Sequence, residues 1–297
     1  LYTIRYTTHL YCVVNYSITK SIEMTGKMQR MKRLFSFHSN KTILLPVDHG
    51  VSLGPTQGLE NLAHVIEQFA NSGKVNGIIG HRRIFSFLAQ PTIKPTAGIL
   101  HISASTRLAN SNNKVLVATV EDAILLGADA ISLHINLGES TESKMLECLG
   151  MVVSKAMQYG LPVLAMVYIR RDDTTFYTPE DIALCARMVD DIGVDIVKVP
   201  YTGTIESFAH VVEGCSIPVL IAGGEKLTTT EDVLTMVSHA LQAGARGISI
   251  GRNIFSAEHP IELLDALELL IHKNASLRSA TILYTTAITH KTRGGDS

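Results

Sequence analysis

A chain of 297 residues with 46% hydrophobic and 18% charged residues has the composition of an ordinary globular protein. It is long enough to bury one large core, and its composition is neither that of a disordered chain nor that of a fibrous one. Its 26 basic and 27 acidic residues leave a net charge of −1. Because no long run of one sign occurs, we expect neither nucleic acid nor a membrane as a partner.

The four cysteines lie far from one another in the sequence and lack histidine partners at metal-binding spacing. We therefore expect reduced thiols in a cytoplasmic protein that binds no metal and uses no cofactor. No apolar run reaches the length of a transmembrane helix. The cysteines are Cys12, Cys148, Cys185 and Cys215.

Within residues 1–30, the segment over 1–23 shows neither a helical stripe nor a heptad pattern. Residues 1–30 predict a disordered tail, or an extension upstream of the natural start, that carries no chemistry. The folded domain is then expected over residues 31–280, followed by a C-terminal tail over 281–297.

From Thr42 onward, short apolar runs alternate with amphipathic segments in which apolar residues recur every three or four positions. Runs that are apolar on both faces indicate buried parallel strands, because helices cover one side and the core the other. Eight such strands alternating with helices predict a single α/β domain, a (β/α)8 TIM barrel. The runs are 42–50, 77–80, 98–103, 130–136, 162–168, 196–201, 218–224 and 247–253.

The third strand–helix unit departs from this pattern. After the run over 98–103 comes the polar segment STRLANSNNK (105–114) in place of a clear helix. Active sites of these barrels are built at the carboxyl ends of the strands. We therefore expect this segment to form a loop that faces the substrate.

Lys198 is the strongest candidate for chemistry, because it lies within the sixth predicted strand. Alternation in DIVKVPY places Lys198 on the face opposite Val197 and Val199, and the two valines suit the helix layer. The lysine then points into the barrel, where desolvation lowers the pKa of its ammonium group and makes a neutral amine nucleophile available. The alternative is a lysine paired with an inward carboxylate for stability alone.

Two other polar side chains end predicted strands on the active-site side. Asp48 ends the first strand, where it either exchanges protons with a substrate or forms an Asx turn. Tyr168 ends the fifth strand, either as a phenol that transfers a proton or as a half-buried packing residue. Arg170 is placed to meet an anionic group, and His49 is a weaker candidate ligand.

Glycines follow the last two strands, in AGG (222–224) and GR (251–252). Small residues there expose backbone N–H groups, and barrels commonly bind phosphate at these strand ends. A lone Gly-Gly pair is more often a turn, but the neighbouring arginine adds a planar set of donors that favours an anion. The expected phosphate contacts are Gly223, Gly224, Gly251 and Arg252.

Six motifs along the barrel resemble the FbaB/DeoC group of class I aldolases. Within this group the chain is most similar to the 2-amino-3,7-dideoxy-D-threo-hept-6-ulosonate (ADH) synthases and the archaeal-type class I fructose-bisphosphate aldolases. The resemblance covers residues 42–273, which is essentially the whole barrel. The motifs are VDHGVSLGPTQGLEN (47–61), HISAST (101–106), LAMVYIR (164–170), DIVKVPYTG (195–203), LIAGGEK (220–226) and GISIGRNIF (247–255).

The resemblance implies that Lys198 forms a Schiff base, that Asp48 accepts a proton and that Tyr168 donates one. It also implies a metal-independent reaction of a phosphorylated keto-sugar and an aldehyde, in an enzyme that forms homo-oligomers. The implied substrate contacts are Asp48, His49, Gly50, Val51, Ser52, Tyr168, Ile169, Arg170, Gly223, Gly224, Gly251 and Arg252.

The sequence departs from the family pattern beside the expected site. Ile169 and Arg171 stand where relatives commonly have Pro and Gly, which changes the loop beside Tyr168 and adds a charge. His81-Arg82-Arg83 stands where a Lys-Gly pair often follows the histidine. Met166 replaces a Trp that the fructose-bisphosphate aldolases share, which favours an ADH-synthase-like reaction with aspartate semialdehyde as the acceptor.

Three other functions stay open at this point. The first is a class I fructose-bisphosphate aldolase. The second is a phosphate-binding barrel isomerase that uses acid–base pairs without a covalent intermediate. The third is a non-catalytic regulator, derived from an aldolase, that binds a sugar phosphate.

Overall fold

The computed structural model describes residues 25–171, 177–224 and 226–294. Two expectations from the sequence fall outside these residues: the character of the chain before residue 25, and the state of Cys12. Within the described part, no helix combines the length and the apolar character needed to cross a membrane.

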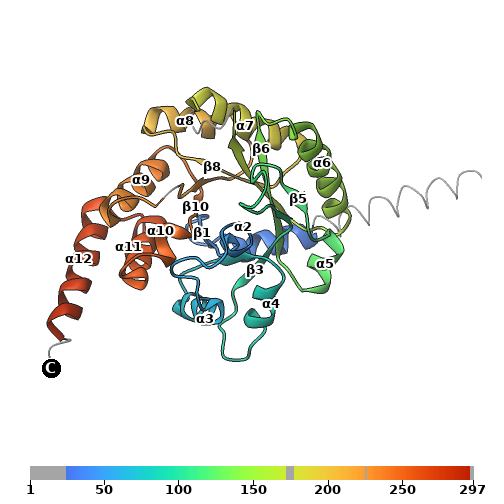
Figure 1. Cartoon of the computed structure of the whole chain (residues 1–297). Helices are drawn as coiled ribbons and strands as arrows, with labels where there is room; N and C mark the ends of the chain where they lie inside the picture. Colours follow the sequence, from blue (N-terminus) through green and yellow to red (C-terminus); the bar gives the residue numbers. More distant parts are fainter. Residues whose placement is uncertain (1–24, 172–176, 225, 295–297) are drawn as a thin grey trace, which may run out of the picture.

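Parallel strands close into a barrel that is surrounded by helices (Figure 1). The barrel has the strand order β1-β10-β9-β8-β7-β6-β3-β2, so that β1 pairs with both β10 and β2. Each predicted apolar run overlaps one of these strands, and the predicted single (β/α)8 TIM barrel is confirmed. The barrel strands are β1 (Thr42–Pro46), β2 (Gly77–Gly80), β3 (Ala97–His101), β6 (Ala130–Leu137), β7 (Val163–Ile169), β8 (Ile196–Pro200), β9 (Val219–Ala222) and β10 (Gly247–Ser249).

Local sequence signals set the starts of several helices. Helices α5, α7 and α9 each follow a threonine whose hydroxyl accepts a hydrogen bond from a backbone N–H three residues on, and an aspartate at that position returns the bond. The helices include α2 (His49–Leu53), α3 (Leu62–Ser72), α4 (Arg83–Leu88), α5 (Val120–Leu125), α6 (Glu142–Gln158), α7 (Pro179–Ile192), α8 (Ile205–Glu213), α9 (Thr230–Gln242), α10 (Arg252–Phe255), α11 (Pro260–His272) and α12 (Leu277–Gly294).

The polar segment of the third unit forms a loop at the carboxyl ends of the strands, as predicted. It connects β4 (Ser103–Ala104) and β5 (Val115–Leu116), which pair as a small antiparallel sheet beside the barrel. The loop over residues 105–114 therefore projects from the edge of the barrel, and α5 follows it.

Strand alternation divides the core into two layers. Outward residues such as Val197 and Val199 on β8 pack against the helices. Inward residues such as Leu164 on β7, Ile196 on β8 and Leu220 on β9 fill the barrel near the amino ends of the strands. The lower part of the barrel is therefore a mainly apolar core that also holds the buried hydroxyls of Thr42 and Ser132, and further polar inward residues, Lys198 among them, lie in the layers above it.

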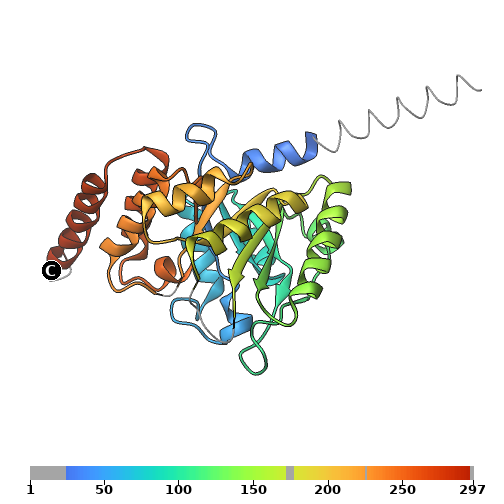
Figure 2. The same ribbon diagram turned by 90° about the horizontal axis from the view of Figure 1, so that it is seen from above.

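A helix over residues 25–34 lies across one end of the barrel (Figure 2). Leu34 is fully buried and joins the inner apolar layer, and its carbonyl accepts a hydrogen bond from the Thr42 hydroxyl at 2.6 Å. Lys27 binds the Asp195 carboxylate at 2.8 Å, just before β8. These contacts place the helix at the amino ends of the strands, where it closes the barrel.

The expected domain limits at residues 31 and 281 both fall inside helices. The first lies within the helix over 25–34, of which only Met31 and Leu34 pack in the inner apolar layer while Met28 is 55% exposed, so its apolar stripe is short. The second lies within α12, which packs on α9 and α11. The residues on both sides of each limit therefore belong to continuous elements.

We predict that Leu34→Ala destabilises the protein by about 2–5 kcal/mol, because it removes a fully buried side chain from the closed end of the barrel. Urea unfolding monitored by circular dichroism measures the change. Leu184→Ala is the matched control, since Leu184 on α7 is 63% exposed. Equal losses in the two variants would show that the N-terminal helix does not contribute to barrel stability.

Candidate active site

Lys198 lies inside the barrel, as strand alternation predicts. On β8 it pairs in register with Met166 of β7 and Leu220 of β9, and only 6% of its surface is exposed. Its Nζ lies 4.0 Å from the Met166 sulfur. Among the described residues, no carboxylate lies within ion-pair distance of this Nζ, so the alternative of a lysine held in a stabilising ion pair finds no support.

The environment of Lys198 favours the neutral amine. Burial lowers the pKa of its ammonium group to about 8, and the opposing charge of Asp48 limits the shift. At pH 7 roughly a tenth of the molecules therefore carries an unprotonated, nucleophilic Nζ. In an exposed lysine, with its ordinary pKa near 10.4, the unprotonated fraction at the same pH would be far smaller.

Asp48 follows β1 and precedes α2. Its side chain makes no capping hydrogen bond to α2, so the turn-forming alternative is not what holds it. Its carboxylate oxygens lie 3.7 Å from His101 Nε2 and 3.8 Å from His49 Nδ1. Burial acts to raise the pKa of Asp48, but His101 and His49, which are protonated at the acidic pH where this carboxyl titrates, together with Lys198 outweigh it and hold the pKa below its usual value. Asp48 is thus a carboxylate at neutral pH.

Tyr168 ends β7 at the mouth of the barrel. Its ring lies 4.8 Å from the ring of His134 on β6, and the guanidinium of Arg170 lies 5.2 Å from its centre. Burial raises the pKa of the phenol well above 10, with a smaller contribution from Asp48. Tyr168 is therefore protonated at neutral pH and can donate a proton or a hydrogen bond.

Two histidines, the buried His101 and the half-buried His134, complete this layer, and reasoning from the sequence missed both. His101 Nδ1 hydrogen-bonds the Ser132 hydroxyl at 2.9 Å, and His134 Nε2 bonds the Asn136 side chain at 2.9 Å. Burial lowers the pKa of His101 to about 4 and that of His134 well below its ordinary value. Both are neutral at pH 7, so the positive charge facing Asp48 there is that of Lys198. The inward alternation of β3 and β6 was the signal that could have revealed them.

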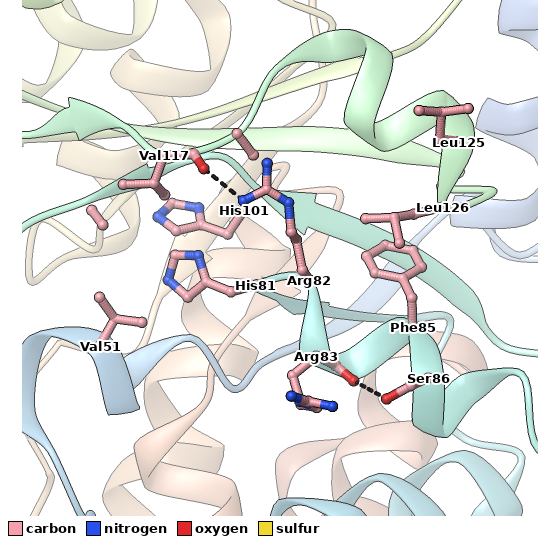
Figure 3. A pocket seen from close by; sticks show the side chains of 12 residues that line it. Val51, His81, Arg82, Arg83, Phe85, Ser86, His101, Val117, Leu125 and Leu126 are labelled. Atoms are coloured by element: carbon pink, nitrogen blue, oxygen red, sulfur yellow. Dashed lines mark hydrogen bonds between the residues drawn. The ribbon is translucent and has the colours of Figure 1, made fainter.

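A pocket of about 730 Å³ opens beside this layer, between β2, β3 and α5 (Figure 3). The rings of His81 and His101 meet edge to face at 5.3 Å on the side toward Asp48. Beside His101, Arg82 donates to the Val117 carbonyl at 2.8 Å (Figure 3). The remaining wall is mainly apolar. Its lining includes Val51, Phe85, Ala104, Ala118, Leu125 and Leu126.

The glycines predicted to bind phosphate lie at adjacent strand ends, because β9 and β10 are paired. A Cβ atom on Gly251 would lie 2.4 Å from the Pro46 carbonyl oxygen, and one on Gly223 would lie 2.8 Å from Ile250. Gly224 has a φ of 63°, in the left-handed region that favours glycine. The backbone at these ends is thus compact and bare of side chains, and Arg252 follows at the start of α10.

The structure places several of the other predicted substrate contacts with their side chains outside the layer around Lys198. The Ser52 hydroxyl donates to the Ser105 carbonyl at 2.9 Å, so it binds the loop over 105–114. Gly50 lies with it on α2. The Ile169 side chain is 2% exposed and packs in the outer core, so only its backbone faces the mouth of the barrel. Val51 lines the neighbouring pocket rather than the layer around Lys198.

Known proteins share both this sequence and this fold. Residues 42–257 match the model of the DeoC/LacD family of aldolases. A 2-amino-3,7-dideoxy-D-threo-hept-6-ulosonate synthase from Archaeoglobus fulgidus is 38% identical over 84% of this chain and 93% of its own length. A 2-amino-4,5-dihydroxy-6-oxo-7-(phosphonooxy)heptanoate synthase from Streptomyces griseus is 34% identical over 84% of this chain and 92% of its own.

An archaeal fructose 1,6-bisphosphate aldolase is similar in structure, with a TM-score of 0.76 and 30% identity over 83% of this chain and 99% of its own. Another structure of such an enzyme, with a TM-score of 0.75, 30% identity and coverage of 83% and 99%, has its catalytic lysine covalently bound to the carbinolamine intermediate of the substrate. With its family model matched along the barrel and relatives this similar over most of their length, the chain belongs to the DeoC/LacD family of aldolases.

Proposed function

We propose that this aldolase forms a Schiff base between Lys198 and a phosphorylated keto-sugar, and that it joins the sugar to an aldehyde. The single observation that carries the proposal is a lysine buried inside the barrel with Asp48 facing it across the site. Burial without an ion pair makes the amine nucleophilic, and nearby groups are in the protonation states that the reaction requires.

In the proposed mechanism, neutral Lys198 Nζ attacks the ketone carbon of the donor and gives a carbinolamine. Loss of water yields an iminium, which withdraws electrons from the adjacent carbon. Loss of a proton from that carbon gives an enamine, and the enamine attacks the carbonyl carbon of the aldehyde to form the new C–C bond. Water then hydrolyses the iminium and frees the product and the amine.

Asp48 and Tyr168 move the protons of these steps. Asp48 is ionised and close to Lys198, so it accepts a proton during enamine formation and stabilises the iminium charge. Tyr168 is protonated and lies at the barrel mouth, so it donates to the oxygen of the incoming aldehyde. In the reverse direction, cleavage, the two groups exchange these tasks.

The donor phosphate binds at the ends of β9 and β10 in this proposal. Phosphate oxygens can approach the backbone N–H groups there, because Gly223, Gly224 and Gly251 have no side chains. Arg252 adds positive charge. His49 and the backbone of α2 border the same space, since a side chain on Gly251 would lie 2.8 Å from His49 Cε1.

We propose aspartate semialdehyde as the acceptor, in an ADH-synthase-like reaction. The similarity to the Archaeoglobus synthase supports this choice. Met166 also supports it, since it stands beside Lys198 where the fructose-bisphosphate aldolases share a Trp. The additional charge of Arg171 is paired, because its guanidinium binds Asp181 of α7 at 2.9 Å.

Fructose-bisphosphate aldolase is the second candidate, and the likeness to the archaeal enzymes of that activity favours it. A coupled assay separates the two candidates. It offers dihydroxyacetone phosphate, fructose bisphosphate and a deoxy-diulose phosphate, each with and without aspartate semialdehyde. We expect product only when the amino-acid aldehyde is present. If fructose bisphosphate is cleaved much faster than any reaction with aspartate semialdehyde proceeds, the second candidate is established instead.

Borohydride reduction tests the Schiff base itself. With dihydroxyacetone phosphate present, we expect a permanent mass increase on the peptide that contains Lys198, because reduction converts the iminium to a stable amine. Lys198→Met should abolish both the adduct and activity. Lys144→Met, which changes an exposed lysine on α6, should alter neither.

An active enzyme whose Lys198 stays unmodified would point to the barrel isomerase. A protein that the sugar phosphate stabilises thermally, but that makes and breaks no C–C bond with any aldehyde tested, would point to the regulator. Mass spectrometry and a thermal shift measurement on the same sample distinguish these outcomes.

The pH dependence of trapping should report the pKa of Lys198. Since only the neutral amine attacks, the rate should rise with pH and level off above about 8. Asp48 raises this pKa, so Asp48→Asn should move the rising limb about one unit lower while it slows turnover. Asp191→Asn, at an exposed carboxylate on α7, is the control. If the trapping rate of the unmodified protein rises only near pH 10, then Lys198 is not desolvated.

We further propose that the protein is a homo-oligomer. Large apolar side chains are exposed on and beside β5, where they border two adjoining hollows of the surface. Light scattering should give a mass of several chains, and a monomer would contradict the proposal. The exposed apolar side chains on and beside β5 are those of Val115, Leu116, Val117, Leu125 and Met151.

A cytoplasmic location is part of the same proposal. Cys148, Cys185 and Cys215 are free thiols, as expected in a reducing compartment. Fractionation of cells that express the tagged protein measures the location directly, and recovery outside the cytoplasm would contradict it.

A further inference from the structure

The loop over residues 105–114 is anchored on both sides of the barrel mouth. On one side, Ser105 accepts a hydrogen bond from Ser52 of α2, four residues after Asp48. On the other side, Asn136 of β6 donates to the Asn112 carbonyl at 2.7 Å. The loop therefore runs from the Asp48 side of the mouth to the Tyr168 side.

Lys114, the last residue of this loop, brings a positive charge into the mouth. Its Nζ donates to the Ser105 hydroxyl at 2.6 Å, and the side chain is half-buried. Burial lowers its pKa, Asp48 acts in the opposite direction, and Arg170 adds to the lowering. Both Asp48 and Arg170 are thus close enough to Lys114 to affect its charge. Within the described residues, no carboxylate lies within ion-pair distance of Lys114 Nζ.

Arg170 approaches the same place from β7. The register of β6 and β7 pairs Asn136 with Tyr168, so the anchor of the loop and the base of Arg170 are adjacent. The Arg170 guanidinium lies over the Tyr168 ring and donates to the Ile169 carbonyl at 3.0 Å. Like Lys114, it is in no ion pair with a carboxylate of the described chain. Two cations therefore face one part of the mouth.

This part of the mouth lies opposite the expected phosphate site. In the closed barrel, β8 with Lys198 separates β9 and β10, which carry Gly223 and Gly251, from β7 and β6, which carry Tyr168 and the loop anchor. The bare backbone at the ends of β9 and β10 and the two cations beside β7 and β6 thus lie on opposite sides of the reacting amine. A bond formed at Lys198 would join a molecule held on one side to a molecule held on the other.

We propose that Lys114, together with Arg170, binds the anionic end of the acceptor aldehyde, a carboxylate or a phosphate, and so selects charged over neutral acceptors. The inference rests on the proposed function, because it assigns the second substrate of the same site. An anion between the two side chains lowers the repulsion between them and leaves the aldehyde carbon directed toward Tyr168.

Acceptor kinetics test this role. With dihydroxyacetone phosphate as donor, Lys114→Met should raise the KM for aspartate semialdehyde and for glyceraldehyde 3-phosphate by roughly tenfold or more. The kcat/KM for neutral glyceraldehyde should change less than about twofold. Lys114→Arg should restore most of the affinity, and Lys144→Met should behave as the unmodified protein. Equal losses with charged and neutral aldehydes, or no loss with either, would overturn the proposal.

Binding of inorganic phosphate gives an answer that does not depend on activity. Titration calorimetry should show two sites in the unmodified protein, of which Lys114→Met removes one and Arg252→Met the other. A single site that only Arg252→Met removes would overturn the inference and leave the proposed Schiff-base function intact. Borohydride trapping of Lys198 should be normal in Lys114→Met, whereas failure of trapping in the unmodified protein would reject the proposed function itself.

Discussion

The desolvation of one ammonium group determines much of this structure. An amine buried among Met166, Leu164 and Leu220 is costly to protonate, and the protein offsets only part of that cost by placing Asp48 across the site without a direct ion pair. A closer carboxylate would hold Lys198 as a permanent cation. A more distant one would leave the iminium charge without stabilisation. The intermediate arrangement keeps the amine both buried and reactive.

This desolvation depends on the closed end of the barrel. Leu34 of the N-terminal helix and Phe35, which follows it, complete the apolar layer below Lys198, so that end of the barrel is closed to water. In the layer above, burial keeps His101 and His134 unprotonated, so these two side chains add no positive charge beside Lys198 at neutral pH. A helix far from the chemistry in sequence therefore contributes to the pKa of the reacting group as well as to stability.

The barrel and the direction of Lys198 could be predicted from the sequence because both depend on alternation within single strands. His101 and Ser132 meet only because β3 and β6 are paired in one particular register, which no single segment of the sequence reveals. The N-terminal helix was missed because only Met31 and Leu34 of its side chains pack in the inner layer, and two such positions are a weak periodic signal. Lys114 required knowledge of where the loop over 105–114 is anchored. The sequence indicated that this loop faces the substrate, but not which of its side chains does so.

The two sides of the proposed site differ in what would contact the substrate, backbone on one side and side chains on the other, and they therefore differ in how easily their specificity can change. The proposed donor side consists of backbone at Gly223 and Gly251, where a side chain would collide with neighbouring atoms of the barrel, so substitutions there are strongly restricted. The proposed acceptor side relies on a lysine at the end of a loop, whose replacement disturbs one hydrogen bond to Ser105. Acceptor preference can therefore change through the loop while the Schiff-base lysine and the donor site stay intact. In a barrel of this kind, relatives that share one covalent mechanism can differ in the aldehyde that they accept.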